Sequence, residues 1–580
     1  MKMINLTINN IPVTVPEGTT ILQAAKQINV DIPSLCYLKD LNCIGACRVC
    51  VVEIVGRRGL TASCTYPVEE GMKVLTNTPA VRASRKTTLE LILSTHNRKC
   101  LSCVRSGKCE LQKLAADYGL DEDRFAVEDE LVPIDYSTPY VVRDNNKCVN
   151  CQRCIAACNK MQSVGAIGNI RRGYDVHVGS PFEMGLGSTA CVGCGQCIVA
   201  CPVGALSEYS NVDKVWAAIS DPSKKVVFFT APSIAATLGE CFDMPVGTNV
   251  EGKMVTAIKM LGDVEAYNMN ITADLTIVEE ANELIERVKS DKPLPMFTSC
   301  CPGWIKFCEH NYPEFLDNLS SCKSPHEMFG AILKTYYAEK MGIDPAKIFV
   351  VSVMPCTAKK FEAARDELKN SSGYADVDAV LTTRELAQMI KEAGIEFNDL
   401  EDSDFDDPMG NATGAAVIFG ATGGVMEAAL RTVADILTGE SLENIDYEQV
   451  RGVEGIKTAT VNVAGKELKV AVASGLANAR KLLDSIKNGE ANYDFIEIMA
   501  CPGGCVNGGG QVIQPSSVRS WVDLRELRAK ATYEEDKALP IRKSHENPFI
   551  KKLYDEFYGE PGSHKAHEDL HTHYHKRENY

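Results

Sequence analysis

The spacing of the cysteines constrains this chain more than any other feature. Its 580 residues include 24 cysteines, and most of them fall in C-x2-C groups. The start of the chain, MKMINLTINN, has no apolar signal segment, so we expect a cytoplasmic protein, in which cysteines rarely persist as disulfides. Grouped cysteines in such a chain are typical of metal sites. We therefore expect a fold organised around several bound metal clusters.

Length, charge and hydrophobicity restrict the classes of protein to which this chain can belong. A chain this long is expected to form several domains. The net charge of −16 argues against nucleic-acid binding, which requires a basic surface. The longest apolar stretches, such as VVFFTAPSIAATLG, are short and interrupted by Pro or Gly, so no membrane span is predicted.

The first cysteine group follows a short β-rich segment. Residues 4–15, INLTINNIPVTV, alternate in apolar character around an Asn-Asn pair, which predicts a hairpin, and TTILQAAKQ predicts a helix with a Thr cap. The group has the spacing C-x10-C-x2-C-x13-C and consists of Cys36, Cys47, Cys50 and Cys64. This order resembles a β-grasp 2Fe-2S ferredoxin module, although the first gap is longer than in plant-type ferredoxins. We expect Cys43, outside this spacing, to be a small buried hydrophobic residue.

A histidine leads the second group. The segment HNRKCLSCVRSGKCELQ contains His96, Cys100, Cys103 and Cys109. A histidine at ligand spacing from three cysteines is more often a ligand than a structural residue, and zinc is the alternative metal. The same pattern occurs in the large iron–sulfur subunit of respiratory complex I and in iron-only hydrogenases, where it holds a 4Fe-4S cluster. The N-terminal 120 residues resemble the start of such subunits.

Two repeats of C-x2-C-x2-C-x3-C come next, in CVNCQRCIAAC and CVGCGQCIVACPVGAL. This pattern is typical of two-cluster bacterial ferredoxins, in which the fourth cysteine of each run ligates the other cluster. We therefore predict one 4Fe-4S cluster on Cys148, Cys151, Cys154 and Cys201. A second is predicted on Cys158, Cys191, Cys194 and Cys197.

From about residue 209 the cysteines become sparse and the pattern becomes βα. Short apolar runs lead into loops and helices in KVVFFT, PMFTSC, KIFVVSV, AAVIFG and DFIEIM, which predicts largely parallel sheets covered by helices. Ligands in such folds bind beyond the carboxyl ends of strands. Three of the runs are followed by cysteines, namely Cys300 and Cys301, Cys356, and Cys501 and Cys505. We expect these strand ends to converge on a metal site.

Three short segments point to a family. TSCCPGW, MPCTAKKFEA and MACPGGCVNGGGQ together are similar to the signature segments of the catalytic domain of iron-only (FeFe) hydrogenases. The upstream modules match in order, so the resemblance covers nearly the whole chain and implies a multidomain α/β protein. It implies an H-cluster, a 4Fe-4S cubane joined to a diiron unit that carries CO, cyanide and a bridging dithiolate. The implied ligands are Cys301, Cys356, Cys501 and Cys505, with Cys505 shared between cubane and diiron unit.

The resemblance also assigns roles beside the cluster. Because successive side chains diverge, Cys301 would ligate while Cys300 stays free, and the family uses this free cysteine as the proton donor to the dithiolate amine. Lys359 would face one cyanide, where an ammonium suits an anionic ligand. Ser233, with Pro232, would meet the other cyanide.

Three apolar positions complete the implied pocket. Met354, Met499 and Phe419 match positions that keep the pocket dry in the family, although periodicity alone would place them in the core. His326, in KSPHEMFG, stands where family members often have Gln.

Protons also need a route to the active site. DLTIVEEANELIERVKS predicts an amphipathic helix with Glu280, Glu283 and Arg287 on one face. Without the resemblance, a solvated face with a Glu283–Arg287 ion pair is the favoured interpretation. The family's proton path matches these three residues together with Ser320 and Cys300, and we therefore predict a proton relay.

Five regions are expected. They are a 2Fe-2S ferredoxin-like domain at 1–78, a 4Fe-4S domain with mixed His and Cys ligands at 79–137, a two 4Fe-4S ferredoxin domain at 138–208, an H-cluster catalytic domain at 209–520, and a small-subunit-like tail at 521–580. The tail ends GSHKAHEDLHTHYHKRENY, and its histidines suit metal binding. A solvated surface tail is the favoured interpretation.

The implied reaction is the reversible combination of two protons and two electrons into H2. The resemblance of the N-terminal 120 residues favours a catalytic subunit with flavin- and NAD(P)-binding and iron–sulfur partner subunits, as in electron-bifurcating hydrogenases; ferredoxin and maturation enzymes are further expected partners. The chain has no Rossmann fingerprint, so NAD(P) chemistry would lie on another chain. The alternatives are a stand-alone ferredoxin hydrogenase, a non-catalytic electron-transfer subunit, an iron–sulfur assembly protein and a sensory hydrogenase.

Overall fold

The N-terminal module is a small mixed sheet built on the predicted hairpin. The computed structural model describes residues 2–120, 124–125, 131–290, 292–407, 409–439, 445–463 and 466–578. Strands β1 (Met3–Ile8) and β2 (Ile11–Pro16) pair antiparallel, and Asn9 and Asn10 between them both have positive φ, as a tight hairpin turn requires. Helix α1 (Ile21–Gln27) begins at Thr20, which accepts a hydrogen bond from the Gln23 N–H. Hairpin and capped helix are confirmed.

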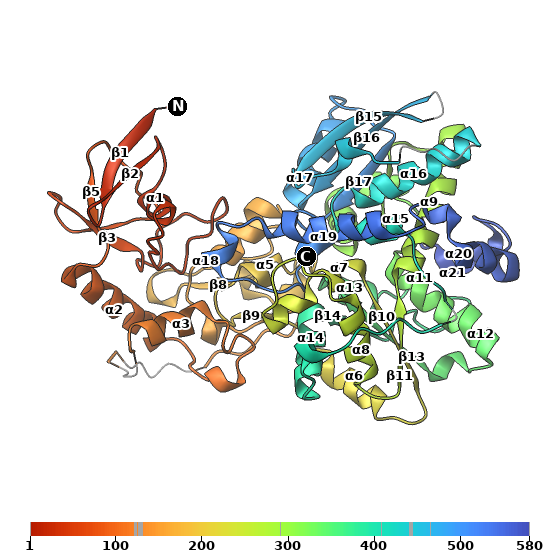
Figure 1. Cartoon of the computed structure of the whole chain (residues 1–580), viewed down its shortest axis with the longest axis horizontal. Coiled ribbons are helices and arrows are strands. Elements are labelled where there is room, and N and C mark those ends of the chain that lie inside the picture. Colours follow the sequence, from red (N-terminus) through yellow and green to blue (C-terminus); the bar gives the residue numbers. More distant parts are fainter. Residues whose placement is uncertain are drawn as a thin grey trace.

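Three more strands complete this sheet, in the order β2-β1-β5-β3-β4. They are β3 (Val51–Ile54), β4 (Leu60–Ala62) and β5 (Lys73–Leu75). Helices α2 (Pro79–Ser94) and α3 (Glu110–Asp117) follow and form the second module. Figure 1 shows these two modules at one end of the molecule, away from the catalytic region.

The two cysteine repeats form the module between that end and the catalytic region. Short helices α4 (Arg153–Ala156) and α5 (Gln196–Ala200) each carry cysteines of one repeat. Strands β6 (Val141–Arg143) and β9 (Leu206–Glu208) close the module as an antiparallel pair. A second small pair is formed by β7 (Gly168–Ile170) and β8 (His177–Gly179).

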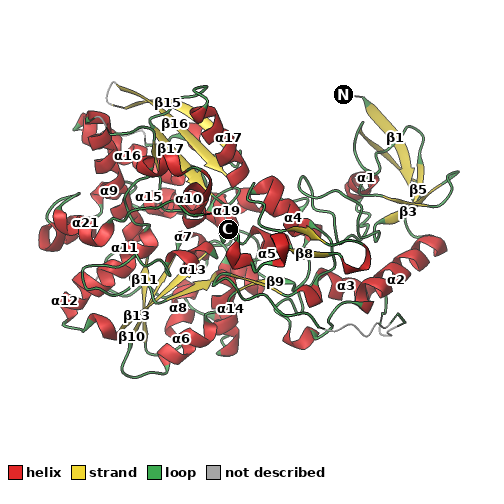
Figure 2. Cartoon of the chain, turned by 180° about the vertical axis from the view of Figure 1, so that it is seen from behind, coloured by secondary structure: helices red, strands yellow, loops and turns green. Residues whose placement is uncertain are grey.

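The catalytic region contains two four-stranded sheets (Figure 2). The first is all-parallel, in the order β11-β10-β13-β14, with β10 (Lys225–Thr230), β11 (Val264–Asn268), β13 (Ile348–Met354) and β14 (Ala379–Thr382). The second is mixed, in the order β12-β17-β16-β15, with β12 (Met296–Phe297), β15 (Ile456–Val463), β16 (Lys466–Ser474) and β17 (Phe495–Met499). The predicted multidomain α/β fold with mixed and parallel sheets is confirmed.

Helices cover both sheets. They are α6 (Val212–Ile219), α7 (Pro232–Ala235), α8 (Glu251–Lys259), α9 (Asn270–Lys289), α10 (Pro302–Asn311), α11 (Pro325–Ile332), α12 (Ala338–Met341), α13 (Ala358–Glu362), α14 (Thr383–Glu392), α15 (Gly414–Val417), α16 (Gly424–Thr438) and α17 (Leu476–Lys487). Helix α9 contributes Leu275 to the core of the first sheet and Ile277 to the core of the second. Because it packs between two cores, its polar residues are also enclosed, and the solvated-face interpretation is wrong: Glu280 is only 1% exposed.

One predicted strand is a helix. The run AAVIFG, residues 415–420, lies in α15 and a following 3-10 turn, Ile418–Gly420. A short, fully buried apolar run has the same hydrophobic pattern in a strand and in a buried helix, so periodicity could not separate them.

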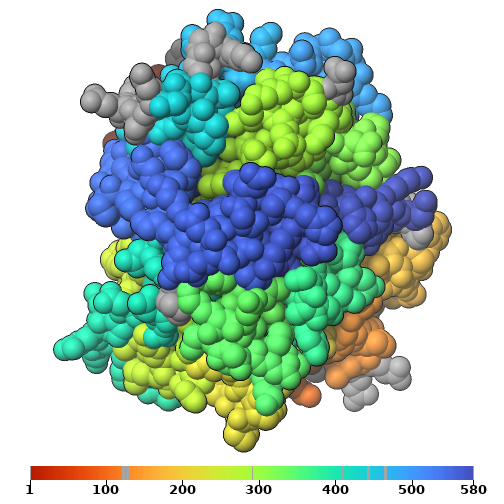
Figure 3. Space-filling model, turned by 90° about the vertical axis from the view of Figure 1, so that its right-hand side faces the viewer, coloured from red at the N-terminus to blue at the C-terminus, as the bar shows by residue number. Residues whose placement is uncertain are grey.

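The C-terminal segment is a belt of helices across the catalytic region, dark blue in Figure 3. Its helices are α18 (Ser516–Arg519), α19 (Leu524–Ala538), α20 (Pro548–Leu553) and α21 (His564–Leu570). Leu553 and Leu570 are completely buried in the core of the first sheet, so the interpretation as a solvated tail is wrong for this segment. His573 and His575 beyond it are exposed. Within the described ranges, no helix combines the length and apolar character that a membrane crossing requires.

Candidate functional site

Four cysteine thiols converge between the two sheets. Cys301 caps the start of α10 after β12, Cys356 follows β13, and Cys501 and Cys505 follow β17. Burial raises the pKa of the Cys505 thiol well above its ordinary value, and the nearby thiols of the other three raise it further. A buried cluster of thiols with this mutual repulsion is the environment that a thiolate-binding iron cluster relieves, because the metal carries the compensating charge.

The glycines after Cys505 allow two modules to touch through their backbones. A Cβ atom at Gly509 would lie 2.2 Å from the carbonyl oxygen of Cys194, and one at Gly195 would lie 2.9 Å from the Cα atom of Gly509. Only residues without side chains fit this contact. Thr357, next to Cys356, donates a 2.6 Å hydrogen bond to the Gly193 carbonyl from the same side. The second cysteine repeat is therefore docked directly on the loops that carry Cys356 and Cys505.

A line of polar side chains leads away from Cys300. Burial raises the pKa of the Cys300 thiol well above its ordinary value, and the negative charge of Glu280 contributes to that rise. Burial, followed by the charge of Glu283, raises the pKa of Glu280 to about 8, and Ser320 hydrogen-bonds its carboxyl group. Ser320 Oγ also donates to Glu283 Oε2 over 3.1 Å. Arg287 donates to Glu283 Oε1 at 2.7 Å from Nη2. Hydrogen bonds thus link Glu280, Ser320, Glu283 and Arg287 in one series, and Glu280 lies close enough to Cys300 for its charge to act on the thiol.

Lys359 lies beside Cys300 in a buried ionic group. Its Nζ donates to the Cys300 carbonyl oxygen at 3.1 Å, to Ser324 Oγ at 2.8 Å and to Glu362 Oε2 at 2.6 Å. Burial lowers the pKa of Lys359, but Glu362 outweighs this and holds the pKa above its ordinary value. The ammonium is therefore charged and fixed at the edge of the pocket.

His326 belongs to the same group. Its Nε2 lies 2.8 Å from Ser352 Oγ, and its Nδ1 lies 3.1 Å from Glu362 Oε2 and 2.9 Å from Glu327 Oε1. Both ring nitrogens are thus engaged by protein atoms. Its position supports Lys359 through Glu362 rather than pointing a free nitrogen into the pocket.

The remaining predicted pocket residues are buried. Ser233 and Pro232 start α7, and the Gln511 amide bridges Ser233 Oγ and the Cys505 carbonyl oxygen, each at 3.3 Å. Three apolar side chains are also almost fully enclosed, namely Met354, Met499 and Phe419. Met499 and Phe419 pack in the same apolar cluster as Cys300.

The cysteines of the two repeats line two separate small cavities. The first is lined by Cys148, Cys151, Cys154 and Cys201. The second is lined by Cys158, Cys191, Cys194 and Cys197. In each cavity the fourth cysteine comes from the other repeat, as the crossed ligation pattern of two-cluster ferredoxins requires. Four thiols facing one enclosed space fit a 4Fe-4S cubane.

The first two modules show the same kind of fit. The Cys36 thiol hydrogen-bonds to the thiols of Cys47 and Cys64, which hold its pKa below the ordinary value. Cys50 hydrogen-bonds to Cys64, so the four sulfur atoms turn toward one another. In the second module, His96 Nδ1 is buried with no hydrogen-bond partner among the described residues. A buried ring nitrogen without a hydrogen-bond partner destabilises the folded state unless it binds a metal.

Cys43 is the one cysteine of the first module that the sequence misplaced. It is exposed, and its thiol donates to the carbonyl oxygen of Cys64 at 2.7 Å. The prediction of a small buried hydrophobic residue is therefore wrong, because Cys43 lies in the surface loop that leads to Cys47.

Hydrogen bonds from both N-terminal modules reach the carbonyl oxygens of cysteines in the third module. Asn42, buried in the first module, donates from Nδ2 to the carbonyl oxygens of Cys36 at 2.8 Å and Cys151 at 3.0 Å. Arg105, in the second module, donates to the carbonyl oxygen of Cys201 at 2.6 Å. Both N-terminal modules therefore meet the cavity lined by Cys151 and Cys201.

Comparison with known proteins agrees with this arrangement. Residues 224–509 match the family described as iron only hydrogenase large subunit, C-terminal domain, and residues 522–577 match iron hydrogenase small subunit. Upstream, residues 1–79 match a 2Fe-2S iron-sulfur cluster binding domain, residues 85–124 match the NADH-ubiquinone oxidoreductase-G iron-sulfur binding region, and residues 188–207 match a 4Fe-4S binding domain.

Relatives that match over the whole chain are hydrogenases by name. The NADP-reducing hydrogenase subunit HndD of Solidesulfovibrio fructosivorans is 48% identical over 100% of both chains. Iron hydrogenase 1 of Clostridium pasteurianum is 44% identical over 99% of this chain and 100% of the relative. A solved structure of apo FeFe-hydrogenase HydA1 from Chlamydomonas reinhardtii is 40% identical, with a TM-score of 0.57, over 63% of this chain and 99% of its own.

Fold, cysteine geometry and comparisons together define an iron–sulfur oxidoreductase. The chain belongs to the iron-only (FeFe) hydrogenase family, with 2Fe-2S and 4Fe-4S binding domains ahead of the catalytic domain, and it is a hydrogenase.

Proposed function

We propose that this chain interconverts H2 with protons and electrons at an H-cluster held by Cys301, Cys356, Cys501 and Cys505. When bound, that cluster would supply the iron chemistry that combines two protons with two electrons. The protein supplies an apolar enclosure, a fixed ammonium at Lys359, a route for protons and a route for electrons.

The observation that carries the proposal is the series of hydrogen-bonded residues Glu280, Ser320 and Glu283, whose inner end acts electrostatically on Cys300. Cys300 is the thiol next to the ligand Cys301, and it has no place among the four ligands of the converging set. Glu280, with a pKa of about 8, is protonated at neutral pH and can hand a proton toward Cys300 while accepting another from the side of Ser320. Glu283 connects Ser320 to the outer end of the chain.

The accessory clusters form a branched route in this proposal. We assign one 2Fe-2S cluster to the first module and 4Fe-4S clusters to the second module and the two cavities of the third. Because both N-terminal modules contact the loops of Cys151 and Cys201, electrons from either would meet at that cubane and then pass to the one on Cys194, which is docked on the catalytic loops.

The branch favours a catalytic subunit with more than one electron partner. A relative over the full length is described as a subunit of an NADP-reducing hydrogenase, and residues 85–124 match a region of NADH-ubiquinone oxidoreductase. We infer that flavin- and NAD(P)-binding and iron–sulfur partner subunits, with ferredoxin, exchange electrons with the N-terminal modules. Maturation enzymes would insert the diiron unit.

Metal analysis of the matured chain tests the assignment. The predicted clusters amount to about 20 iron atoms per chain. Infrared bands of CO and cyanide should be present in chain produced with the maturation enzymes and missing from chain produced without them. Matured, active protein that lacks those bands would remove the H-cluster from the proposal.

A further inference from the structure

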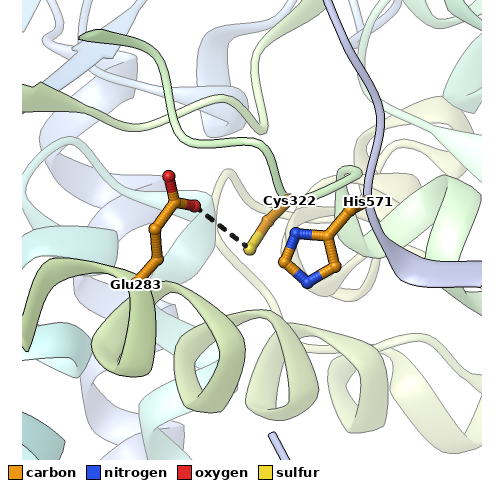
Figure 4. A group of neighbouring side chains, drawn as sticks. All are labelled: Glu283, Cys322 and His571. Atoms are coloured by element: carbon orange, nitrogen blue, oxygen red, sulfur yellow. Dashed lines mark hydrogen bonds between the residues drawn. The ribbon is translucent and has the colours of Figure 1, made fainter. Parts of the chain in front are cut away.

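The proton chain meets the C-terminal segment at Glu283. Ser321 donates to Glu283 Oε2 twice, from its backbone nitrogen at 3.0 Å and from Oγ at 3.1 Å. The same Ser321 Oγ lies 2.8 Å from Nδ1 of His571, which directly follows α21. Figure 4 shows Glu283 on its helix with Cys322 and His571 facing it from two other segments.

Backbone pairing holds His571 in this place. His571 and Cys322 form an antiparallel bridge, in which Thr572 N–H donates to the Ser321 carbonyl and Lys323 N–H donates to the Leu570 carbonyl, both at 2.8 Å. The imidazole itself is only 7% exposed. Its position is therefore fixed by the fold and does not depend on a single side-chain contact.

Both ring nitrogens of His571 have partners that can accept a hydrogen bond. The Ser321 hydroxyl, which donates to Glu283, lies next to Nδ1. On the other side, Nε2 lies 3.2 Å from Oε2 of Glu279, which also accepts from the Gly562 N–H, while Oε1 of the same carboxylate accepts from the Tyr554 hydroxyl. A ring held between two such partners can carry a proton on either nitrogen.

Arg287, at the other side of Glu283, cannot serve as a proton donor. Its guanidinium donates to Glu283 and to the carbonyl oxygens of Pro293, Asp317 and Leu319. A guanidinium stays protonated under all physiological conditions, so it can orient Glu283 but cannot release a proton to it.

We propose that His571, acting through Ser321, is a proton-relay residue that connects Glu283 to solvent. Building on the proton chain of the proposed function, the imidazolium passes the Nδ1 proton to Ser321 Oγ while the Ser321 hydroxyl passes its own proton to Glu283 Oε2. The neutral ring keeps its Nε2 proton, so Nδ1 is the atom that must be recharged: the ring turns to bring Nδ1 to water beside the exposed His567, whose ring centroid lies 4.1 Å away, takes up a proton there and turns back. One proton moves inward with no change in electrons, and H2 oxidation runs the same steps in reverse.

The charged surroundings suit this role. Glu279 and Glu283 face the ring from α9, Cys322 faces it from the loop before α11, and Tyr554 and His567 approach through the C-terminal segment. Two carboxylates therefore face the ring, one at Nε2 and one beyond Ser321. Negative groups on both sides favour a ring that takes up a proton and passes it on.

Kinetics of full-length, matured variants test the relay. His571→Gln keeps hydrogen-bonding groups but cannot carry a proton, and it should lower dye-driven H2 evolution by roughly tenfold and change its pH profile. Ser321→Ala should lower the rate similarly, and the double variant should lose little more, because both act in one path. His573→Gln, an exposed histidine two residues further on, should behave as wild type.

Imidazole rescue separates relay from structure. Added imidazole should restore most of the rate of His571→Ala, while hydrogen–deuterium exchange of 564–574 in the same matured variant reports whether the segment stays docked. Loss without rescue means a structural role and overturns the inference. A wild-type rate and pH profile in His571→Gln overturns it as well, and the proposed proton chain survives if Glu283→Gln is inactive. If Glu283→Gln is also fully active, the proton chain itself falls, and this inference with it.

Discussion

Asn42 donates one hydrogen bond to the carbonyl oxygen of Cys151, 109 residues away, and a second to that of Cys36. A single buried amide thus joins the cysteine loop of the 2Fe-2S module to the cysteine loop of the first repeat. The contact would position the two proposed clusters relative to each other without any direct bond between them.

Replacing this amide should slow electron transfer without affecting catalysis. In Asn42→Ala, the carbonyl of Cys151 loses its donor and the two loops are no longer tied, so the 2Fe-2S module should dock less well. Reoxidation of the pre-reduced 2Fe-2S cluster under turnover, followed by rapid-freeze electron paramagnetic resonance, should be several-fold slower than in wild type. Dye-driven H2 evolution should be unchanged; an equal loss in both measurements would mean that Asn42 supports the whole fold.

Cys300 and Cys301 should fail in different ways when replaced. Cys300→Ala should retain its full iron content and cluster spectra but lose nearly all turnover, because the group that delivers protons inside the pocket is gone. Cys301→Ala should lose part of the active-site iron, because a ligand is removed. Iron analysis and infrared spectra of the two variants, side by side, check this; Cys300→Ala with wild-type turnover would contradict the proton role.

The pKa of Glu280 predicts a dependence of stability on pH. Burial and the charge of Glu283 raise its pKa from 4.5 to about 8. The folded chain therefore keeps a proton on Glu280 that the unfolded chain has released, so this contribution is complete below pH 4.5 and is lost as the pH rises through 8. Glu280→Gln, which stays neutral, should unfold in urea at a midpoint that falls less than that of wild type between pH 5 and 9. Parallel curves for the two cluster-free chains would mean that Glu280 is ionised when folded.

The sequence predicted elements whose signals are local. The hairpin around Asn9 and Asn10 and the Thr20 cap each depend on residues a few positions apart, and the crossed cysteine repeats have a fixed spacing within each run. The prediction of a strand at AAVIFG was wrong because a fully buried apolar run has no alternation of polar and apolar residues from which to identify its secondary structure. Glu280 lies on the predicted helix, but its burial could not be predicted from α9 alone, because α9 packs between two cores.

Contacts between segments far apart in the chain could not be predicted from the sequence. Ser321 and His571 are 250 residues apart, and neither lies in a motif; only the bridge between Cys322 and the end of α21 brings them together. The contacts of Asn42 could not be predicted either, since its partners belong to two different modules. The glycines of the GGGQ segment are visible in the sequence, but their partner is not: the contact of Gly509 with the backbone of the second cysteine repeat could not be foreseen.

His326 should be important for stability as well as for the site. Burial lowers its pKa, but Glu327 and Glu362 outweigh this and hold the pKa above its ordinary value, so a charged imidazolium compensates two enclosed carboxylates. His326→Leu leaves both without that partner and should lower the free energy of unfolding by about 3–5 kcal/mol. His326→Gln, which retains hydrogen-bonding capacity, should lose less. Urea unfolding of the cluster-free chains measures both; a neutral His326→Leu would show that the pair contributes nothing.

Pyridine nucleotide should reach this chain only through another protein. Contacts of both N-terminal modules with the loops of Cys151 and Cys201 provide two docking ends for one active site. We expect the isolated, matured chain to evolve H2 with an artificial low-potential donor but not with NADH or NADPH, because the chain has no Rossmann fingerprint. Adding a flavoprotein partner subunit should establish the coupled activity.

Truncation then shows which end the partner uses. Removing residues 1–80 takes away the 2Fe-2S module, together with Asn42 and the apolar core on which Trp521 packs, but leaves the second cysteine repeat on the catalytic loops. Coupled activity should fall much more than dye-driven activity, which can use the remaining clusters. The matched control is Asn42→Ala in the full-length chain, which should show a smaller loss of the same kind. Efficient NADH oxidation by the chain alone, or equal loss of both activities on truncation, would refute a flavoprotein partner at this end and favour a stand-alone hydrogenase that exchanges electrons with ferredoxin.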